Sequence, residues 1–247
     1  MRERKRIPPA GFSALSLNRV RMTGSLTAGI AAFIVLCAPA VFAQTAPAAR
    51  FVVLLDAAHG GADSGARLDS ELEKAYTLAF SVRLRSLLMV RGMDVVITRD
   101  SDTTVDPDQR AAVADRARPQ ACLSLHASES GSGVHIFVSS LAPVQPGTML
   151  PWKTAQAAWI ERSSTLAGVI NSALTHAGMA VTLGRVALPA IDSMTCPAVA
   201  LEIAPGQASD NSGSASLDYA DYQSRVADAL AAALVEWRSE DRGGRQP

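Results

Sequence analysis

The 247-residue sequence has no excess of charge of either sign, only three cysteines and no visible internal repeat. It also has no series of long apolar runs, which excludes a protein with several membrane spans. Because 48% of its residues are hydrophobic, the chain can still bury a core of ordinary size. The length fits one domain, or one domain with short appendages.

Basic residues become scarce once the N-terminus is set aside. Residues 1–43 hold six Lys or Arg and one Glu, out of 23 basic and 23 acidic residues in the whole chain. The rest therefore has 17 basic and 22 acidic residues, a net charge of −5. A mildly acidic body argues against nucleic acid as a partner, because such binding needs clustered Lys and Arg.

The scarcity of cysteine limits covalent cross-links. Cys37 lies in the apolar N-terminal run, so a processed chain keeps only Cys122 and Cys196. These two allow at most one disulfide, and sequence separation does not show that they meet in space. We expect two buried free thiols, with a single disulfide as the alternative.

The N-terminus has the order of features that is typical of an export signal. Basic residues up to Arg21 precede the apolar run from Ala28 to Leu36, and small residues then lead to Ala43. We predict a signal peptide over residues 1–43, with Met22 as a second candidate start. The mature protein is expected in the periplasm or cell envelope.

An uncleaved membrane anchor is the alternative reading of the same segment. Residues 26–43 are almost long enough to span a bilayer. Pro39 and the small residues that end the run favour cleavage. Contact with a membrane is expected only if the leader stays attached.

After a linker at residues 44–50, strand patterns alternate with helix patterns. This alternation predicts a single α/β domain over residues 51–237, with a mostly parallel central sheet and helices on both faces. A disordered tail is expected at residues 238–247. The expected strands are residues 51–56, 94–99, 120–126, 133–140, 186–191 and 197–203. The expected helices are residues 71–91, 107–118, 154–176 and 218–237.

Four side chains with metal or acid–base chemistry fall at or just after strand ends. They are His59, Glu73, His126 and Glu202. The carboxyl ends of parallel strands share one edge of a sheet, where sites of α/β proteins form. Two His and one Glu are a known ligand set for catalytic zinc, with one position left for water. The chain has no short local zinc motif, so spacing alone is a weak signal.

Each of these residues also has an ordinary structural explanation. Glu73 lies three residues after Ser70 and would complete a helix capping box. His59 in its glycine-rich loop would be solvated, and His126 would bond to backbone at a strand end. Glu202 would form a salt bridge. The joint placement of all four at one edge favours a site.

The same residues resemble the zinc-dependent N-acetylmuramoyl-L-alanine amidases of bacterial cell-wall turnover. Residues 56–66 (DAAHGGADSGA) match most of the family motif Asp-x-Gly-His-Gly-Gly-x-Asp-x-Gly-Ala. Further matches run along nearly the whole mature chain. They are Glu73-Lys74, residues 98–102 (TRDSD), Arg110, residues 124–126 (SLH), Gly133-Val134 and residues 197–202 (PAVALE).

The resemblance implies one zinc ion bound by His59, Glu73 and His126, with Glu202 as the catalytic carboxylate. Zinc lowers the pKa of its water to about 7, and a neighbouring carboxylate transfers the proton to the leaving amine. The implied reaction is hydrolysis of the amide between N-acetylmuramic acid and L-alanine in peptidoglycan. The alternatives are a catalytically impaired peptidoglycan-binding module and a zinc peptidase acting within the stem peptide.

The sequence departs from the family pattern around the expected cleft. Ala57 and Ala58 replace the usual Pro and Gly, and Ser128 replaces a frequent Asn. His135 stands where an acid is common, and it is expected to be a bystander, as is His176. Residues 203–206 (IAPG) also replace the usual Gly-Phe.

One segment has no clear chemical assignment. Residues 144–162 hold two tryptophans and lie where some relatives carry a regulatory helix that blocks the site. Because this segment is short, we expect it to form a lid or a substrate wall. A regulatory protein partner is left open.

Overall fold

A computed structural model describes residues 50–69, 71–145, 147–206 and 220–243. The predicted signal peptide, its anchor alternative and nearly all of the linker lie outside these residues. Within the described residues, none of the helices combines the length and the apolar character needed to cross a membrane.

The centre of the protein is a six-stranded sheet with the strand order β2-β1-β3-β6-β4-β5. Strands β2, β1, β3 and β6 run parallel to one another, whereas β4 is antiparallel to β6 and parallel to β5. The strands are β1 (Val52–Ala57), β2 (Asp94–Ile97), β3 (Ala121–Ala127), β4 (Val134–Ser139), β5 (Val181–Val186) and β6 (Ala198–Ile203).

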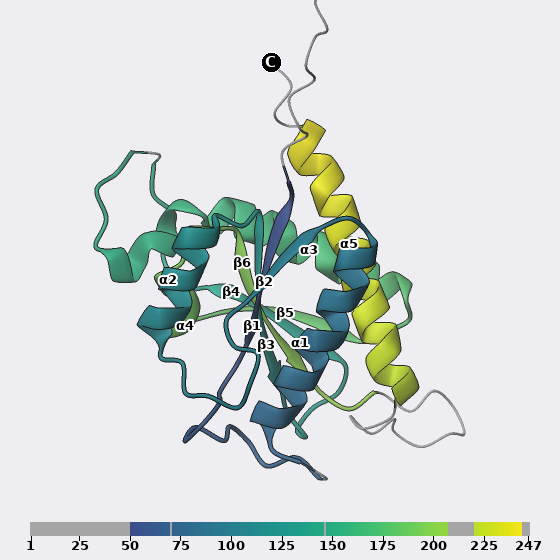
Figure 1. The fold of residues 1–247 in the computed structure, drawn as a ribbon. Helices are drawn as coiled ribbons and strands as arrows, with labels where there is room; N and C mark the ends of the chain where they lie inside the picture. The colour runs from purple at the N-terminus through teal and green to yellow at the C-terminus, as the bar shows by residue number, and fades with distance from the viewer. Residues whose placement is uncertain (1–49, 70, 146, 207–219, 244–247) are drawn as a thin grey trace, which may run out of the picture. The chain divides into compact units, whose positions relative to one another are not determined.

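Helices cover both faces of this sheet, as Figure 1 shows. Their bounds are α1 (Glu73–Val90), α2 (Pro107–Ala117), a 3₁₀ helix η1 (Trp152–Ala158), α3 (Ile160–His176), α4 (Pro189–Asp192) and α5 (Ala220–Gly243). The larger core lies where α1, α3 and α5 pack on one face, and the smaller core lies under α2 and α4. The predicted α/β domain with a mostly parallel sheet is confirmed.

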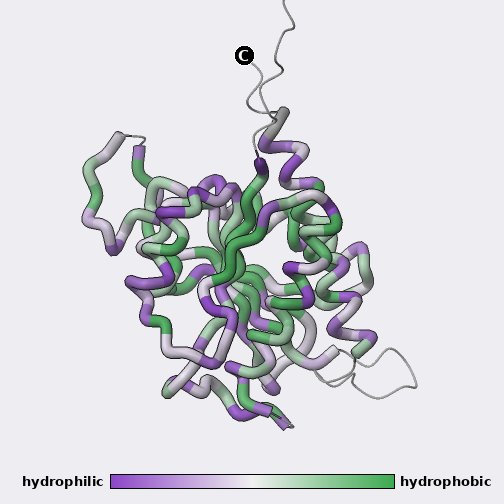
Figure 2. Tube along the Cα trace, viewed as in Figure 1, coloured by the Kyte–Doolittle hydropathy of each residue, from purple (hydrophilic) through white to green (hydrophobic). Residues whose placement is uncertain are grey.

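The two cores follow from the alternation of side chains along each strand. In β3, Leu123 and Leu125 enter the larger core, while Cys122 faces the smaller one. Both sides of the central strands are therefore apolar, as the hydrophobic centre of Figure 2 shows. His126 is in step with Cys122, so its side chain leaves the sheet on the α2 and α4 side.

The local signals for α2 are confirmed. The Asp106 side chain accepts a hydrogen bond from the Gln109 backbone N–H, and the Gln109 side chain accepts one from the Asp106 backbone. This capping box satisfies two donors of the first helical turn. It fixes the start of the helix that carries Arg110.

Three predicted elements are corrected. The strand expected at residues 186–191 is β5 at Val181–Val186, and Pro189 instead begins the short helix α4. The helix expected at residues 154–176 is divided at Trp159, since the 3₁₀ helix η1 ends at Ala158 and α3 begins at Ile160. The tail expected from residue 238 is helical as far as Gly243, and residues 244–247 lie outside the described part.

The expectation of two free thiols is wrong, because Cys122 and Cys196 form a disulfide. Cys122 lies near the start of β3, and Cys196 lies two residues before the start of its neighbour β6. The pairing of these strands brings the two Cα atoms to 6.3 Å, within the range that a disulfide spans.

We expect removal of the disulfide to lower the free energy of unfolding. Its two cysteines are 74 residues apart, and the chain-entropy model gives a loop of this length about 4 kcal/mol of stabilisation. We expect the double variant Cys122→Ala/Cys196→Ala to lower the free energy of unfolding by about 2–4 kcal/mol in urea denaturation. Reduced wild-type protein is the control, and equal unfolding midpoints for the oxidised wild type and the variant would contradict the expectation.

Candidate metal centre

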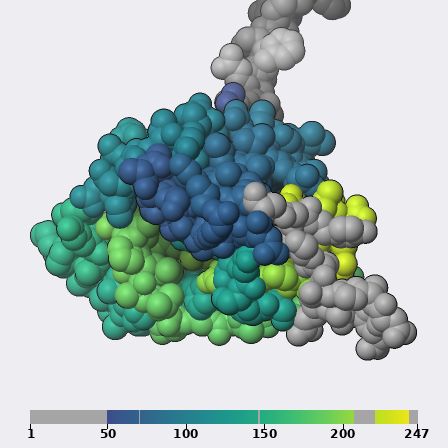
Figure 3. Space-filling view, turned by 90° about the horizontal axis from the view of Figure 1, so that it is seen from below, coloured from purple at the N-terminus to yellow at the C-terminus, as the bar shows by residue number. Residues whose placement is uncertain are grey.

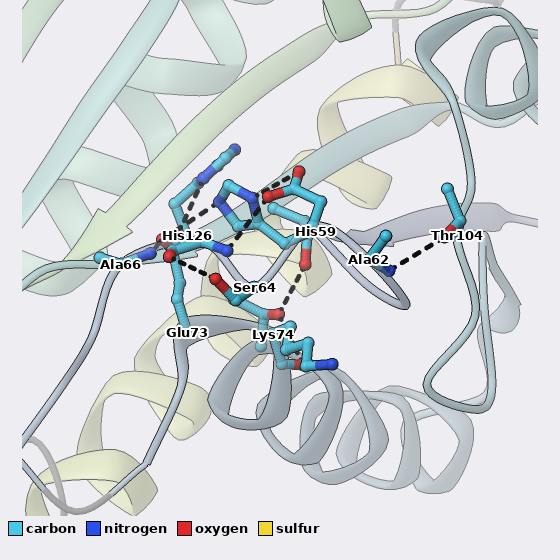
Figure 4. A network of polar contacts seen from close by, with 12 residues as sticks. His59, Ala62, Ser64, Ala66, Glu73, Lys74, Thr104 and His126 are labelled. Carbon is cyan, nitrogen blue, oxygen red and sulfur yellow. Dashed lines mark hydrogen bonds and ion pairs between the residues drawn. The ribbon is translucent and has the colours of Figure 1, made fainter.

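The three predicted ligands come together at the carboxyl ends of β1 and β3. One donor atom from each of His59, Glu73 and His126 lies within 4.8 Å of the others. Figure 4 shows both imidazole rings beside the Glu73 carboxylate. His59 comes from the loop after β1, Glu73 from the first turn of α1, and His126 from the end of β3.

Glu73 is the centre of this cluster. Its Oε2 atom lies 3.1 Å from His59 Nε2, and its Oε1 atom lies 3.0 Å from His126 Nδ1. The same two oxygens accept hydrogen bonds from the backbone N–H groups of Ala66 and Ala127. Burial alone would raise the pKa of Glu73, but these bonds outweigh it and hold the pKa well below its usual range.

Glu73 is no helix cap. The residue before the first helical turn is Leu72, which makes no side-chain capping bond, and Ser70 lies outside the described residues. The Glu73 side chain is buried and turned to the histidines. The capping explanation for this carboxylate is therefore wrong.

His59 is oriented from its other ring nitrogen. Its Nδ1 atom lies 2.9 Å from Asp63 Oδ2, so Nε2 faces Glu73. The hydrogen bond to Glu73 raises the pKa of His59, burial opposes it, and Asp63 adds to the rise. A carboxylate behind a histidine is the usual support of a metal ligand, because it fixes the ring and its tautomer.

The close approach of His59 and Glu73 depends on Gly65. A Cβ atom at this position would lie 2.6 Å from His59 Cδ2 and 2.7 Å from Glu73 Oε2. Its φ of +64° also lies in the left-handed region that glycine adopts without strain. A side chain at residue 65 would therefore push the two proposed ligands apart.

Two buried arginines hold the backbone that leads to His59. Arg110 donates to the backbone oxygens of Ala57 and His59, both at 2.9 Å. Arg99 donates to the oxygens of Ala57 and Ala58 at 2.9 and 3.0 Å. His59 itself has a φ of +62°, which is uncommon for a residue with a side chain.

The Asp56 carboxylate holds one of these two arginines in place. It is buried at the end of β1 and forms an ion pair with Arg110. It also accepts hydrogen bonds from Thr98 Oγ1 at 2.7 Å and from Ser124 Oγ at 2.8 Å. Asp56 thus joins α2 and strand β3 to the start of the His59 loop.

Glu202 lies in a row of polar side chains across the sheet. It pairs directly with His126 on β3 and with His135 on β4, and His135 pairs with Thr182 on β5. Directly paired residues face the same side of a sheet, with Cβ atoms about 4.5–5.5 Å apart. Glu202 is partly exposed, and none of the described residues forms a salt bridge with it.

His135 is not one of the three grouped ligands, as the sequence predicted, but its side chain has a partner beside Glu202. Its Nδ1 atom lies 2.6 Å from Thr182 Oγ1, and its ring flanks Glu202 on the side opposite His126. His176 is exposed at the end of α3 and belongs to no such row.

The 3₁₀ helix η1, which lies within residues 144–162, does not cover the cluster. The Gln156 side chain donates to the backbone oxygens of Met194 and Cys196, which precede β6. Glu202 lies at the other end of that strand. The lid or substrate wall expected here is therefore wrong for the 3₁₀ helix η1.

The donor set suits zinc. Two imidazole nitrogens and one carboxylate oxygen are common ligands of catalytic zinc, which keeps a further position for water or substrate. Both imidazoles present a ring nitrogen to the same carboxylate, and their rings lie edge to face with centroids 5.2 Å apart. The residues present therefore fit a single zinc ion.

Comparison with known proteins agrees with this donor set. The sequence model of one protein family, described as N-acetylmuramoyl-L-alanine amidase, matches residues 53–236. The chain belongs to this amidase family.

Individual relatives match smaller parts of this chain than the family model does. The N-acetylmuramoyl-L-alanine amidase Rv3717 of Mycobacterium tuberculosis is 30% identical over 165 residues, which are 64% of this chain and 65% of the relative. AmiA of Escherichia coli is 33% identical over 94 residues, which are 36% of this chain and 32% of the relative. The chain thus spans less than two thirds of these curated relatives.

A solved structure covers more of the fold. The catalytic domain of CwlV from Bacillus (Paenibacillus) polymyxa superimposes with a TM-score of 0.59 at 25% sequence identity. The match covers 76% of this chain and 98% of that domain.

The sequence marked the supporting residues without giving their roles. Asp63, Arg99 and Arg110 all belong to the family matches, but their targets are a ring nitrogen and backbone oxygens. The strand register that puts His135 beside Glu202 had no sequence signal, because β4 and β6 are far apart in the chain.

The contacts of Arg110 with Asp56 and with the backbone oxygens of Ala57 and His59, here called the clamp, predict an effect on metal binding. Arg110→Lys keeps the charge, but an ammonium cannot reach Asp56, Ala57 and His59 with a planar fork. Loss of a supporting contact of this kind typically costs about 10–100-fold in metal affinity. We expect a loss of that size in zinc titrations.

Arg116→Lys is the matched control, because this exposed arginine lies on the same helix and is not part of the clamp. Circular dichroism of both variants separates a local effect from unfolding. Unchanged zinc affinity in folded Arg110→Lys would contradict the clamp.

Proposed function

We propose that this protein is an exported zinc amidase that hydrolyses the amide between N-acetylmuramic acid and L-alanine in peptidoglycan. The observation that carries the proposal is the His59, Glu73 and His126 cluster with Glu202 paired beside His126. Membership of the amidase family supports the bond and the substrate.

The proposed roles follow from the contacts of each side chain. His59, Glu73 and His126 hold zinc, which supplies Lewis acidity toward water and the amide carbonyl at neutral pH. Asp63 keeps the Nε2 atom of His59 turned inward. The two backbone N–H groups on Glu73 keep its carboxylate charged and fixed.

Glu202 is the proposed general base and acid. One of its carboxylate oxygens accepts a proton from the attacking water and then passes that proton to the departing amine of L-alanine. Its partial exposure, without a salt bridge in the described residues, leaves the carboxylate available for this task. His135, tethered to Thr182, flanks the carboxylate and borders the space for the substrate.

The cluster is partly exposed at its end of the sheet. Figure 3 views the molecule from below, and the dark blue segment after β1 lies on the surface near the middle of that view. His126 and His59 keep part of their side-chain surface exposed, at 36% and 21%. A polymer can therefore approach from outside the domain.

Export is the proposed location, and the disulfide supports it. Disulfides persist in oxidising compartments such as the periplasm and are rare in the cytosol. The Cys122–Cys196 bond is buried in the domain, so it belongs to the folded structure. The proposed signal peptide at residues 1–43 would supply the route.

Removal of zinc tests the proposal. We expect a strong chelator to abolish release of stem peptides from purified peptidoglycan, and stoichiometric zinc to restore it, because the cluster holds the only proposed Lewis acid. Mass spectrometry of the products identifies the bond that is cut. Products cleaved inside the stem peptide would show a peptidase, and purified protein that binds no zinc would sink the proposal.

Substitution of the proposed base gives a second test. We expect Glu202→Gln to retain zinc and to cut peptidoglycan about 10²–10⁴-fold more slowly, the usual range for loss of a general acid–base group. Glu236→Gln, on the exposed side of α5, is the control. Equal activity of wild type and Glu202→Gln would remove Glu202 from the mechanism, and binding without cleavage by both would indicate a wall-binding module.

A further inference from the structure

A concave site lies at the end of the sheet opposite the metal cluster. It is a cavity of about 380 Å³ whose lining includes Gln120 and Pro197, the residues that immediately precede β3 and β6. His126 lies six residues after Gln120, roughly 20 Å away at about 3.3 Å of rise per residue. The cavity is therefore separate from the cluster, and its volume is in the range of small-ligand sites.

The wall of this cavity combines one aromatic ring with charged and hydroxyl side chains. Trp159, partly exposed at the start of α3, contributes the indole. Thr195 and Asp115 are joined by a hydrogen bond of 2.6 Å, and Arg118 follows at the end of α2.

An ion pair closes the other side of the cavity. Arg162 on α3 lies 2.8 Å from Asp241 on α5, and both line the space. The guanidinium also lies over the buried ring of Trp237, 4.4 Å from its centroid. These contacts join α3 to α5, so the ion pair and the ring contact hold the arginine in place on this side of the cavity.

The charges and the ring define the class of ligand. Two acidic and two basic side chains give the lining no net charge, which does not favour a phosphate or a nucleotide. An apolar ligand would bury these polar groups without hydrogen-bond partners. A pyranose ring fits both features, because its C–H face stacks on an indole and its hydroxyls donate to carboxylates and accept from guanidiniums.

We propose that this cavity binds a sugar residue of a glycan strand, remote from the hydrolytic site. The proposal rests on the proposed function, because a peptidoglycan hydrolase meets glycan as a polymer of many identical units. Attachment at a second point keeps the enzyme at the wall and raises the effective concentration of substrate at the cluster.

The direct test is a titration of the full-length protein with chitotetraose, a soluble β-1,4-linked tetramer of N-acetylglucosamine, followed by isothermal titration calorimetry. We expect saturable binding to wild type and to Glu202→Gln, and its loss in Trp159→Ala. Trp152→Ala is the matched control, because Trp152 is 52% exposed and lies outside the cavity. No binding to wild type, or equal binding to Trp159→Ala, would overturn the proposal.

A second cavity variant keeps the proposal testable if Trp159→Ala does not fold. Arg118→Asn removes the guanidinium and suits the left-handed backbone at this residue, whose φ is +48°. We expect it to weaken the binding of chitotetraose as well. Unchanged binding in both cavity variants would contradict the assignment.

Hydrolysis supplies an independent readout. We expect Trp159→Ala to lower the ratio of the rate on insoluble sacculi to the rate on a soluble disaccharide-peptide by about tenfold, since only the polymer offers a second attachment point. An unchanged ratio would contradict the anchoring role. If wild type cuts neither substrate, the proposed function fails, and the chitotetraose titration alone decides the cavity.

Discussion

The buried ion pair between Asp56 and Arg110 is the contact on which the site depends. A charge without its partner at such a depth typically costs about 3–5 kcal/mol, so the pair is retained as a unit. Arg110 also donates hydrogen bonds to the backbone oxygens of Ala57 and His59. Asp56 also accepts a hydrogen bond from Ser124 of β3. The same contact therefore fixes the first proposed ligand and the strand that carries His126.

The cluster is rigid for a second reason. Glu73 reaches both imidazoles while two backbone N–H groups hold its oxygens, so the ligand set is arranged by the protein itself. Preorganisation of this kind removes the ordering cost that a loose site would carry on binding. The close approach of His59 and Glu73 requires glycine at residue 65, since no side chain fits between them.

Local patterns in the sequence predicted the elements that local contacts determine. The α2 cap, the apolar strands and the placement of His59, His126 and Glu202 at strand ends all followed from residues close together in the chain. The common edge of the parallel strands was also predicted, but the order in which distant strands pair was not. The Cys122–Cys196 bond and the place of His135 beside Glu202 both require β6 to lie between β3 and β4. The β5 error arose because Pro189, read as part of a strand, begins a helix.

The position of β6 in the sheet also determines at which stage of folding the site is assembled. This strand is the last of the six in the chain, yet it lies between β3 and β4, which are made much earlier. Glu202 consequently reaches His126 only when β6 has entered a gap inside the sheet, a contact between distant parts of the chain of the kind that forms late in folding. Until β6 has entered this gap, the chain has its three candidate metal ligands but lacks the carboxylate beside them. The proposed hydrolytic centre is therefore complete only when the last strand of the sheet is in place.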